Sequence, residues 1–177
     1  MPKKTDTRDR VLRTAATLFR AQGYHATGLN QVLAEGGAPK GSLYFHFPGG
    51  KEQLAVEALQ LSAAEFGQEL RTAGSLDGAL KVLGDRLEAS GFRDGCPVAT
   101  VALDVASESD QIRAACESAY AMWERMIADA LTARNVPNAN DLAPVILAMI
   151  EGALLRARTQ RSTAPLQQVG AYLKSLG

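Results

Sequence analysis

Residues 41–51, GSLYFHFPGGK, place several groups that can bind a phosphate within eleven consecutive positions. The hydroxyl of Tyr44 and the imidazole of His46 can each donate a hydrogen bond to a phosphate oxygen, and Lys51 adds a positive charge. A hydrophobic core would spread its rings along one face of an element rather than gather them beside a turn. The pattern therefore predicts a segment that contacts a polyanion.

The residues just before these rings suit the exposed start of a helix that enters the major groove of DNA. Lys40 can reach a guanine or a phosphate, and Gly41 and Ser42 are small enough to let the backbone approach the base edges. Leu43 and Phe47 are expected to face the core, and Tyr44 and His46 to face outward. The direction of Phe45 is left open by the spacing.

Three helices are predicted to position this segment. The first has an apolar face at Val11, Ala15, Leu18 and Phe19 and ends at Gly23. Thr27 is the predicted N-cap of a short second helix and a second anchor on the DNA backbone. The third helix starts at Pro39 and ends before Pro48, and Lys51 opens a long fourth helix whose free N–H groups can bind an anion. Two short helices after a longer one indicate a helix-turn-helix.

Helical periodicity continues to the end of the chain, and no strand pattern or internal repeat is present. We expect helices at about 76–92 and 98–106, one capped by Ser109, one capped by Asn140, and a last one from Pro165. The prediction is an all-α protein with an N-terminal helix-turn-helix DNA-binding domain over residues 1–50. A helical ligand-binding and dimerisation domain is expected over residues 51–177.

The formal net charge of zero hides an uneven distribution along the chain. Residues 1–54 hold eight lysines and arginines against four aspartates and glutamates, whereas residues 55–177 hold eleven against fifteen. A basic first part is typical of a nucleic-acid partner, although chance alone can produce so small a difference. No apolar run is long enough to cross a membrane and the N-terminus lacks the apolar segment of a signal peptide, so we expect a cytoplasmic protein without a membrane partner.

The segment at about 141–158 is apolar around almost its whole circumference. A helix of this kind must be covered on all sides. In a chain of 177 residues a partner subunit is the simplest cover for the extra face, so the pattern predicts one.

Large soft side chains on separate C-terminal helices are candidates for a ligand pocket or for ordinary core. In the pocket interpretation Cys96 lies near its wall, and Glu151 pairs with a polar group of the ligand. The alternative for Glu151 is an interface or an ion pair. The candidate ligand-binding residues are Phe66, Phe92, Cys96, Tyr120, Trp123, Met126 and Met149.

The stretch TRDRVLRTAATLFRAQGYHATGLNQVLAEGGAPKGSLYFHFPGGKEQL closely resembles the DNA-binding domain of the tetracycline-repressor (TetR) family of bacterial regulators. The matching features are the A-x-x-L-F…G-Y-x-x-T run and the K-G-S-L-Y-x-H-F block followed by K-E-x-L. The resemblance covers roughly residues 6–56. The stretch GCPVATVALDVA at 95–106, together with PGGKEQL, resembles the LmrA/YxaF-like branch.

The resemblance implies a homodimer of about nine helices per chain, joined through its last two helices and bound to a near-palindromic double-stranded DNA operator. It also implies a small effector that releases the operator, here an aromatic, flavonoid-type or drug-like molecule, and no cofactor. The turn at 48–50 is one residue longer than in tetracycline repressor, which changes the reach of Lys51. The DNA contacts carried over are Thr27, Lys40, Gly41, Ser42, Tyr44, His46 and Lys51.

Two other functions compete with that of a ligand-responsive repressor. An enzyme would need a nucleophile with its base or a set of metal ligands, but the only histidines are His25 and His46, and neither has a second ligand at metal spacing. We therefore expect neither catalysis nor a metal site. The second alternative is a thiol-based redox sensor on the same frame, using Cys96 or Cys116.

Overall fold

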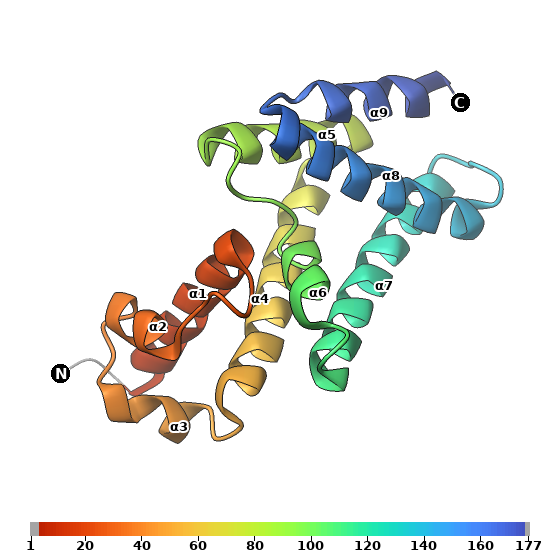
Figure 1. The fold of residues 1–177 in the computed structure, drawn as a ribbon. Helices are drawn as coiled ribbons and strands as arrows, with labels where there is room; N and C mark the ends of the chain where they lie inside the picture. Colours follow the sequence, from red (N-terminus) through yellow and green to blue (C-terminus); the bar gives the residue numbers. More distant parts are fainter. Residues whose placement is uncertain (1–3, 176–177) are drawn as a thin grey trace. The chain divides into compact units, whose positions relative to one another are not determined.

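The computed structural model describes residues 4–175, and in that range it is all-helical (Figure 1). A single 3-10 turn, Lys40–Ser42, precedes the third α-helix. Within these residues there is no strand, in agreement with the predicted fold class. The nine α-helices are α1 Lys4–Gln22, α2 Leu29–Glu35, α3 Leu43–His46, α4 Gly50–Thr72, α5 Leu76–Ala89, α6 Ala99–Val105, α7 Asp110–Thr132, α8 Ala139–Gln160 and α9 Ala164–Ser175.

The chain forms two compact units. The first contains the chain up to Ala64 together with Pro97–Ala119, and the second contains Glu65–Cys96 and the chain from Tyr120 onward. Helices α4 and α7 therefore each contribute residues to both units. Each unit has its own set of side chains that share a core.

The core of the first unit is built from the predicted apolar faces of its helices. Leu43 and Phe47 are buried as expected, and they hold α3, which at four residues is too short to be stable alone. Together these side chains fix the corner between α2 and α3. The core includes Val11, Ala15, Phe19, Val32, Leu33, Leu43, Phe47, Leu54, Ala58, Val101 and Ile112.

Gly23 ends α1, as predicted. Its φ of +85° lies in the left-handed region that a side chain rarely adopts, and its N–H donates to the carbonyl oxygen of Phe19. A Cβ at this position would lie 2.9 Å from Oδ2 of Asp104 on α6. Glycine is thus needed here for backbone conformation and for the approach of α6.

In the second unit α9 packs against both α8 and α5 (Figure 1). Ser75 caps α5, because its hydroxyl oxygen accepts a hydrogen bond from the N–H of Gly78 over 3.0 Å. Leu80, Leu83 and Leu87 of α5 are buried. The core of this unit is thus shared between α5, α8 and α9 and the parts of α4 and α7 that belong to it.

Several predicted helix ends differ from the structure. The N-cap of α2 is Gly28 rather than Thr27, and the N-cap of α8 is Asn138 rather than Asn140. Helix α5 ends at Ala89 instead of continuing to Phe92, because Gly91 and Phe92 both adopt positive φ. These positions depend on local backbone geometry that periodicity does not report.

The predicted cap of α7 is confirmed. The hydroxyl oxygen of Ser109 accepts a hydrogen bond from the N–H of Ile112 over 3.1 Å, and the Ser109 hydroxyl in turn donates to Glu52 of α4. One serine thus satisfies a free N–H group at the start of α7 and joins α7 to α4 within the first unit.

Candidate functional site

The predicted recognition helix is a 3-10 turn followed by one turn of α-helix. Pro39 precedes the 3-10 turn with φ −60°, and its carbonyl oxygen accepts a hydrogen bond from the hydroxyl of Ser42 over 2.7 Å. Lys40 and Gly41 are exposed at this end. The small residues therefore lie on the surface, where a backbone can approach a groove.

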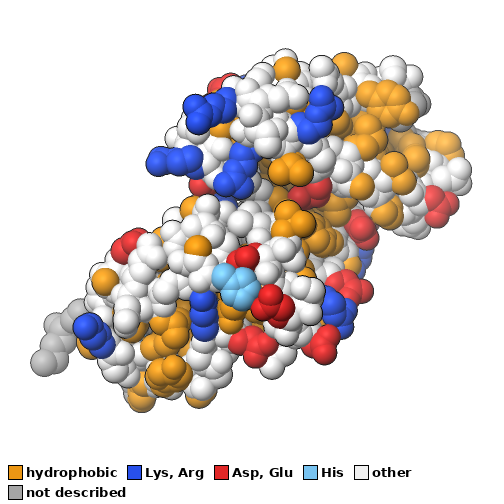
Figure 2. All heavy atoms as spheres, viewed as in Figure 1, with side chains coloured by type: hydrophobic (Ala, Val, Ile, Leu, Met, Phe, Trp, Pro, Cys, Tyr) orange, Lys and Arg blue, Asp and Glu red, His pale blue; other side chains and the backbone are white. Residues whose placement is uncertain are grey.

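Tyr44 and Phe45 project from α3 into solvent. Their side chains are 66% and 62% exposed, and Figure 2 shows hydrophobic side chains gathered on the surface over α3, at the lower left. The structure thus answers the question left open for Phe45, which faces outward with Tyr44. His46 is half-buried and its ring meets the edges of Phe45 and Phe47, at 5.0 and 6.5 Å between centroids.

The turn at residues 48–50 supports the ring of Tyr44. Gly50 has a φ of +66°, and a Cβ there would lie 3.5 Å from Cε1 of Tyr44. The Tyr44 ring therefore lies over the first residue of α4. This contact explains why a glycine-rich corner follows an exposed aromatic residue in the sequence.

A chain of polar contacts fixes the start of α4. The N–H of Gly49 donates to Oε1 of Gln53 over 2.8 Å, and the amide of Gln53 donates to Glu57 over 2.9 Å. Glu57 is paired with Arg8 of α1 at 2.5 Å, and the Arg8 guanidinium carbon lies 4.8 Å from the centroid of the Phe47 ring. The corner that carries the recognition helix is thus tied to α1 and α4.

Lys51 lies on the aromatic face of Tyr24. Its ammonium nitrogen is 4.4 Å from the ring centroid, and partial burial lowers its pKa while the nearby Asp104 carboxylate opposes that change. Burial, together with the charges of Glu52 and Glu108, raises the pKa of the Tyr24 hydroxyl. Lys51 is therefore held in place by its neighbours rather than extended freely into solvent.

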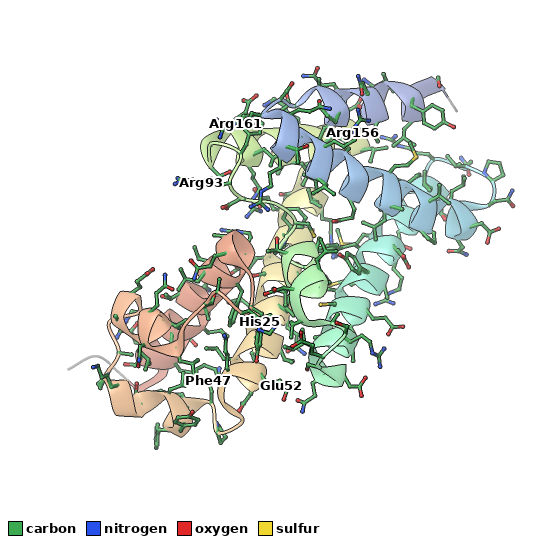
Figure 3. The ribbon with its side chains drawn as sticks, viewed as in Figure 1. His25, Phe47, Glu52, Arg93, Arg156 and Arg161 are labelled. Carbon is green, nitrogen blue, oxygen red and sulfur yellow. The ribbon has the colours of Figure 1, made fainter. Side chains whose placement is uncertain are left out.

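Sequence reasoning missed the acidic group on α6 that contacts the corner between α1 and α2. The N–H of His25 donates to Oδ2 of Asp104 over 2.7 Å, and the His25 Nε2 lies 3.3 Å from a carboxylate oxygen of Glu108. The side chain of His25 is labelled in Figure 3. No periodic signal marks Asp104, since it is a single acid on a seven-residue helix. The contact joins residues 79 positions apart in the sequence.

Thr27 is fully buried in this structure. Its hydroxyl donates to the carbonyl oxygen of Gly23 over 2.6 Å and accepts a bond from Gln22, while its N–H donates to the carbonyl oxygen of Tyr24. A phosphate contact by this side chain would require these bonds to open. Thr27 closes the turn between α1 and α2, and its contact with DNA stays a prediction.

The second unit contains a pocket of about 690 Å³ between α4, α5, α7 and α8. Of the predicted ligand-binding residues it brings together Phe66, Trp123 and Met126. It does not place Phe92, Cys96, Tyr120 or Met149 in the wall. Further apolar lining residues, which sequence reasoning missed, include Leu70, Leu83, Met122, Ile146, Ile150 and Leu154.

Trp123 is the centre of the aromatic contacts in this unit. Its ring centroid lies 5.3 Å from that of Phe66 and 5.9 Å from that of Tyr120. Gly67 of α4 leaves room for the indole, because a Cβ there would lie 3.3 Å from Nε1 of Trp123. Tyr120 thus contacts Trp123 of the pocket wall without lining the pocket itself.

Glu151 of α8 is one of two acids in the pocket wall, and the other, Asp129, is exposed. Burial raises the pKa of the Glu151 carboxyl, and a hydrogen bond from the Cys96 thiol lowers it by a smaller amount. Cys96 therefore acts on the pocket through Glu151 without lining it.

Both cysteines are buried and neither is in a disulfide. Burial raises the pKa of the Cys116 thiol to about 11. Since the thiolate is the reactive form, Cys116 is suited to packing rather than to redox chemistry.

Within residues 4–175 the structure contains no helix that is both long and apolar enough to span a membrane. The same residues contain no group of three or more potential metal-ligating side chains. Both findings concern only the described part of the chain.

Two family models match the chain. Residues 11–58 match the model for bacterial regulatory proteins of the tetR family, and residues 72–172 match the model for the C-terminal domain of LmrA/YxaF-like transcriptional regulators. The first match covers the predicted recognition helix and the start of α4. The second contains most of the pocket wall.

Individual relatives agree with these models. The chain is 36% identical to the HTH-type transcriptional regulator LmrA of Bacillus subtilis, covering 97% of this chain and 96% of that protein. The reduced form of Escherichia coli NemR superposes with a TM-score of 0.81 at 26% identity, covering 96% of each chain. The TetR regulatory protein of Rhodobacter sphaeroides has the same fold, with a TM-score of 0.84 at 23% identity over 93% of this chain and 95% of that chain.

Proposed function

Because the chain belongs to the TetR family of bacterial regulators, in its LmrA/YxaF-like branch, and is a DNA-binding transcriptional regulator, we propose that it is a ligand-released repressor. It binds a near-palindromic operator as a homodimer in the cytoplasm. Residues 1–50 read the DNA, and residues 51–177 bind the effector and form the dimer.

The exposed surface of the recognition helix supports this proposal most strongly. Lys40, Gly41 and the 66% exposed Tyr44 lie on the surface next to the start of α4, where Lys51 is held by Tyr24. Small residues at the helix start permit entry into the major groove, and the tyrosine hydroxyl and two lysines can bind phosphates. We assign Ser42 and His46 to the same surface.

An exposed apolar stripe on α8 supports the homodimer. Val145 and Leu155 are 55% and 57% exposed, and Ala148 and Gly152 lie exposed between them at spacings of three and four residues. Tyr172 of α9 is 52% exposed, and Figure 2 shows hydrophobic side chains on the surface over α8 and α9. Such a stripe can pair with its own copy in a four-helix bundle.

The effector is assigned to the pocket of the second unit. Its volume of about 690 Å³ and its apolar, aromatic wall suit a small aromatic or drug-like molecule. Trp123, the sole tryptophan of the chain, lies in that wall, so its fluorescence reports on binding.

A binding-site selection tests the DNA-reading part of the proposal. The full chain is incubated with a library of random duplexes, and bound sequences are amplified and sequenced through several rounds. We expect a near-palindrome bound by two protomers, as measured by sedimentation of the complex. Enrichment of no sequence, or binding by one protomer, would contradict the proposal.

A thermal-shift screen of aromatic compounds then tests the effector. Compounds that raise the melting temperature are added to the protein–operator complex, and the release of labelled DNA is followed by fluorescence anisotropy. We expect some of them to release the operator. Stabilising compounds that leave every complex intact would remove ligand release from the proposed function.

Redox sensing through Cys96 is the second candidate, because the chain resembles NemR, whose structure is described as a reduced form. Cys96 is buried and donates to the carboxyl of Glu151. Replacing Cys96 by Ser keeps a donor and removes the thiol. If peroxide releases the operator from the native chain but not from this variant, redox sensing is the function.

A further inference from the structure

The wall of the pocket in the second unit holds two carboxyl groups, those of the exposed Asp129 and of the half-buried Glu151. Glu151 lies in the middle of α8, next to Ile150 and one turn from Leu147 and Leu154, and all four residues line the pocket. Burying an apolar residue at position 151 would cost less free energy, because a carboxylate loses part of its hydration there. The acid at this place therefore requires an explanation other than packing.

No lysine or arginine in the described part of the chain forms an ion pair with Glu151. Its polar contact is the thiol of Cys96, which is a weak donor. Among residues 4–175 the carboxylate thus has no charged partner. A ligand with a positive charge would supply the missing partner.

Other charged groups of the pocket lie on exposed residues. Arg71, Arg125 and Arg134 carry positive charge and Asp129 carries negative charge, and all four residues are exposed. Because they are exposed, their charges are screened by water and salt. Glu151 is therefore the one ionisable group among the described residues of the pocket wall that is half-buried rather than exposed.

The aromatic side chains of the pocket wall also suit a positively charged ligand. One face of Phe66 is occupied by the Arg86 guanidinium, whose carbon lies 5.0 Å from the ring centroid. The indole of Trp123 is the other large π surface of the wall. Indole is the side chain that attracts cations most strongly through its ring face, and it also stacks on flat rings.

We propose that this pocket takes an aromatic ligand with a protonated amine, whose N–H groups donate to the carboxylate of Glu151 while its ring lies against Trp123. The inference rests on the proposed effector pocket and specifies the class of effector. Burial favours the neutral acid in the empty pocket, and a bound cation favours the carboxylate, so binding of the amine releases a proton from Glu151 where that group is protonated.

Three naphthalene derivatives of equal ring size test the inference. The protonated 1-naphthylmethylamine, the neutral 1-naphthylmethanol and the anionic 1-naphthoate are titrated into the full chain without DNA, and their affinities are measured by calorimetry. We expect the amine to bind about tenfold or more tightly than the alcohol, since a charged hydrogen bond replaces a neutral one. The naphthoate should bind most weakly.

The variant Glu151→Gln keeps the size of the side chain and removes its charge. We expect it to bind the amine and the alcohol with equal affinity, while its melting temperature stays at or above that of the native chain. If the variant does not fold, the relative affinities of the three ligands for the native chain still test the inference. Equal binding of the alcohol, tighter binding of the naphthoate, or no binding by any of the three would overturn the inference.

Failure of this inference differs from failure of the proposed function. A protein released from its operator by neutral ligands but indifferent to the amine remains a ligand-responsive regulator, and only the cationic class is wrong. A protein that binds the amine through Glu151 but keeps its operator retains the inference and loses the proposed effector response.

Discussion

The N–H of His25 donates a hydrogen bond to Oδ2 of Asp104 over 2.7 Å, and this bond ties the corner between α1 and α2 to α6. Oδ2 of the same carboxylate lies 2.9 Å from the position that a Cβ on Gly23 would occupy. Its negative charge also favours the charged form of Lys51. One acid of α6 thus contacts the segment that ends α1 and acts on the lysine at the start of α4. Within the first unit, Asp104 of α6 therefore links the ends of helices that we propose to contact DNA.

We expect Asp104→Ala to lower the free energy of unfolding by about 1 to 2 kcal/mol, because it leaves the His25 N–H without its acceptor. Urea unfolding followed by circular dichroism measures the change. Asp104→Asn keeps an oxygen acceptor and serves as the matched control, with a smaller loss. Equal stability of the alanine variant and the native chain would show that this bond does not hold the corner.

The position of Lys51 predicts one phosphate contact. Replacing Lys51 by Ala should weaken operator binding at low salt and reduce the slope of log affinity against log salt concentration by about one. Anisotropy titrations at several salt concentrations give this slope. Lys81 of α5, whose exposed ammonium pairs with Asp85, is a matched control whose loss should leave the slope unchanged. An unchanged slope for Lys51→Ala would remove Lys51 from the contact surface.

Trp123 is predicted to matter more for the effector than for DNA. Trp123→Ala removes a buried ring and should cost about 3 to 5 kcal/mol of stability, so it cannot separate the two roles. Trp123→Phe keeps an aromatic ring in contact with Phe66. We expect this variant to bind the operator within about twofold of the native chain while ligands release it less readily. A parallel loss of folding, DNA binding and release would make Trp123 a core residue only.

The raised pKa of Glu151 predicts how stability changes with pH. The folded chain holds this proton more tightly than the unfolded chain, so the contribution of Glu151 to stability falls as pH rises from below its ordinary value of 4.5 through the folded value. The Glu151→Gln variant has no titratable carboxyl group at this position. The gain in unfolding free energy of this variant over the native chain should therefore be larger near pH 8 than near pH 4.

Urea unfolding of both chains at the two pH values measures that difference. Glu124→Gln, at a partly exposed position of α7 outside the pocket wall, is a control that should show no comparable change. A gain for Glu151→Gln that is the same at both pH values would mean that Glu151 is not in a desolvated site.

The sequence predicted the helix type and the inward faces well, because apolar periodicity directly reflects burial. Leu43 and Phe47 were placed in the core, and Ser109 was identified as a cap, from spacing and residue type alone. The burial of Thr27 and the role of Asp104 were not predictable in this way. Both depend on contacts between segments that meet only after the helices have packed.

The pocket shows the same limit. Phe66, Trp123 and Met126 were candidates because they are large and soft, but Phe92 and Met149 have the same properties and do not line the cavity. Whether such a residue faces a cavity or a neighbouring helix depends on how α4, α5, α7 and α8 pack. Sequence periodicity indicates which face of a single helix is buried. It does not indicate the shape of the space that four packed helices enclose.

The most direct test of the central claim measures operator affinity for the native chain and for a variant carrying both Lys40→Ala and Tyr44→Phe. Both side chains are exposed, so the melting temperature should barely change. We predict that the double variant binds the selected operator at least about tenfold more weakly, because a lysine contact and a phenolic hydrogen bond are lost. Equal affinity of the two proteins, with both folded, would contradict the assignment of this surface to DNA.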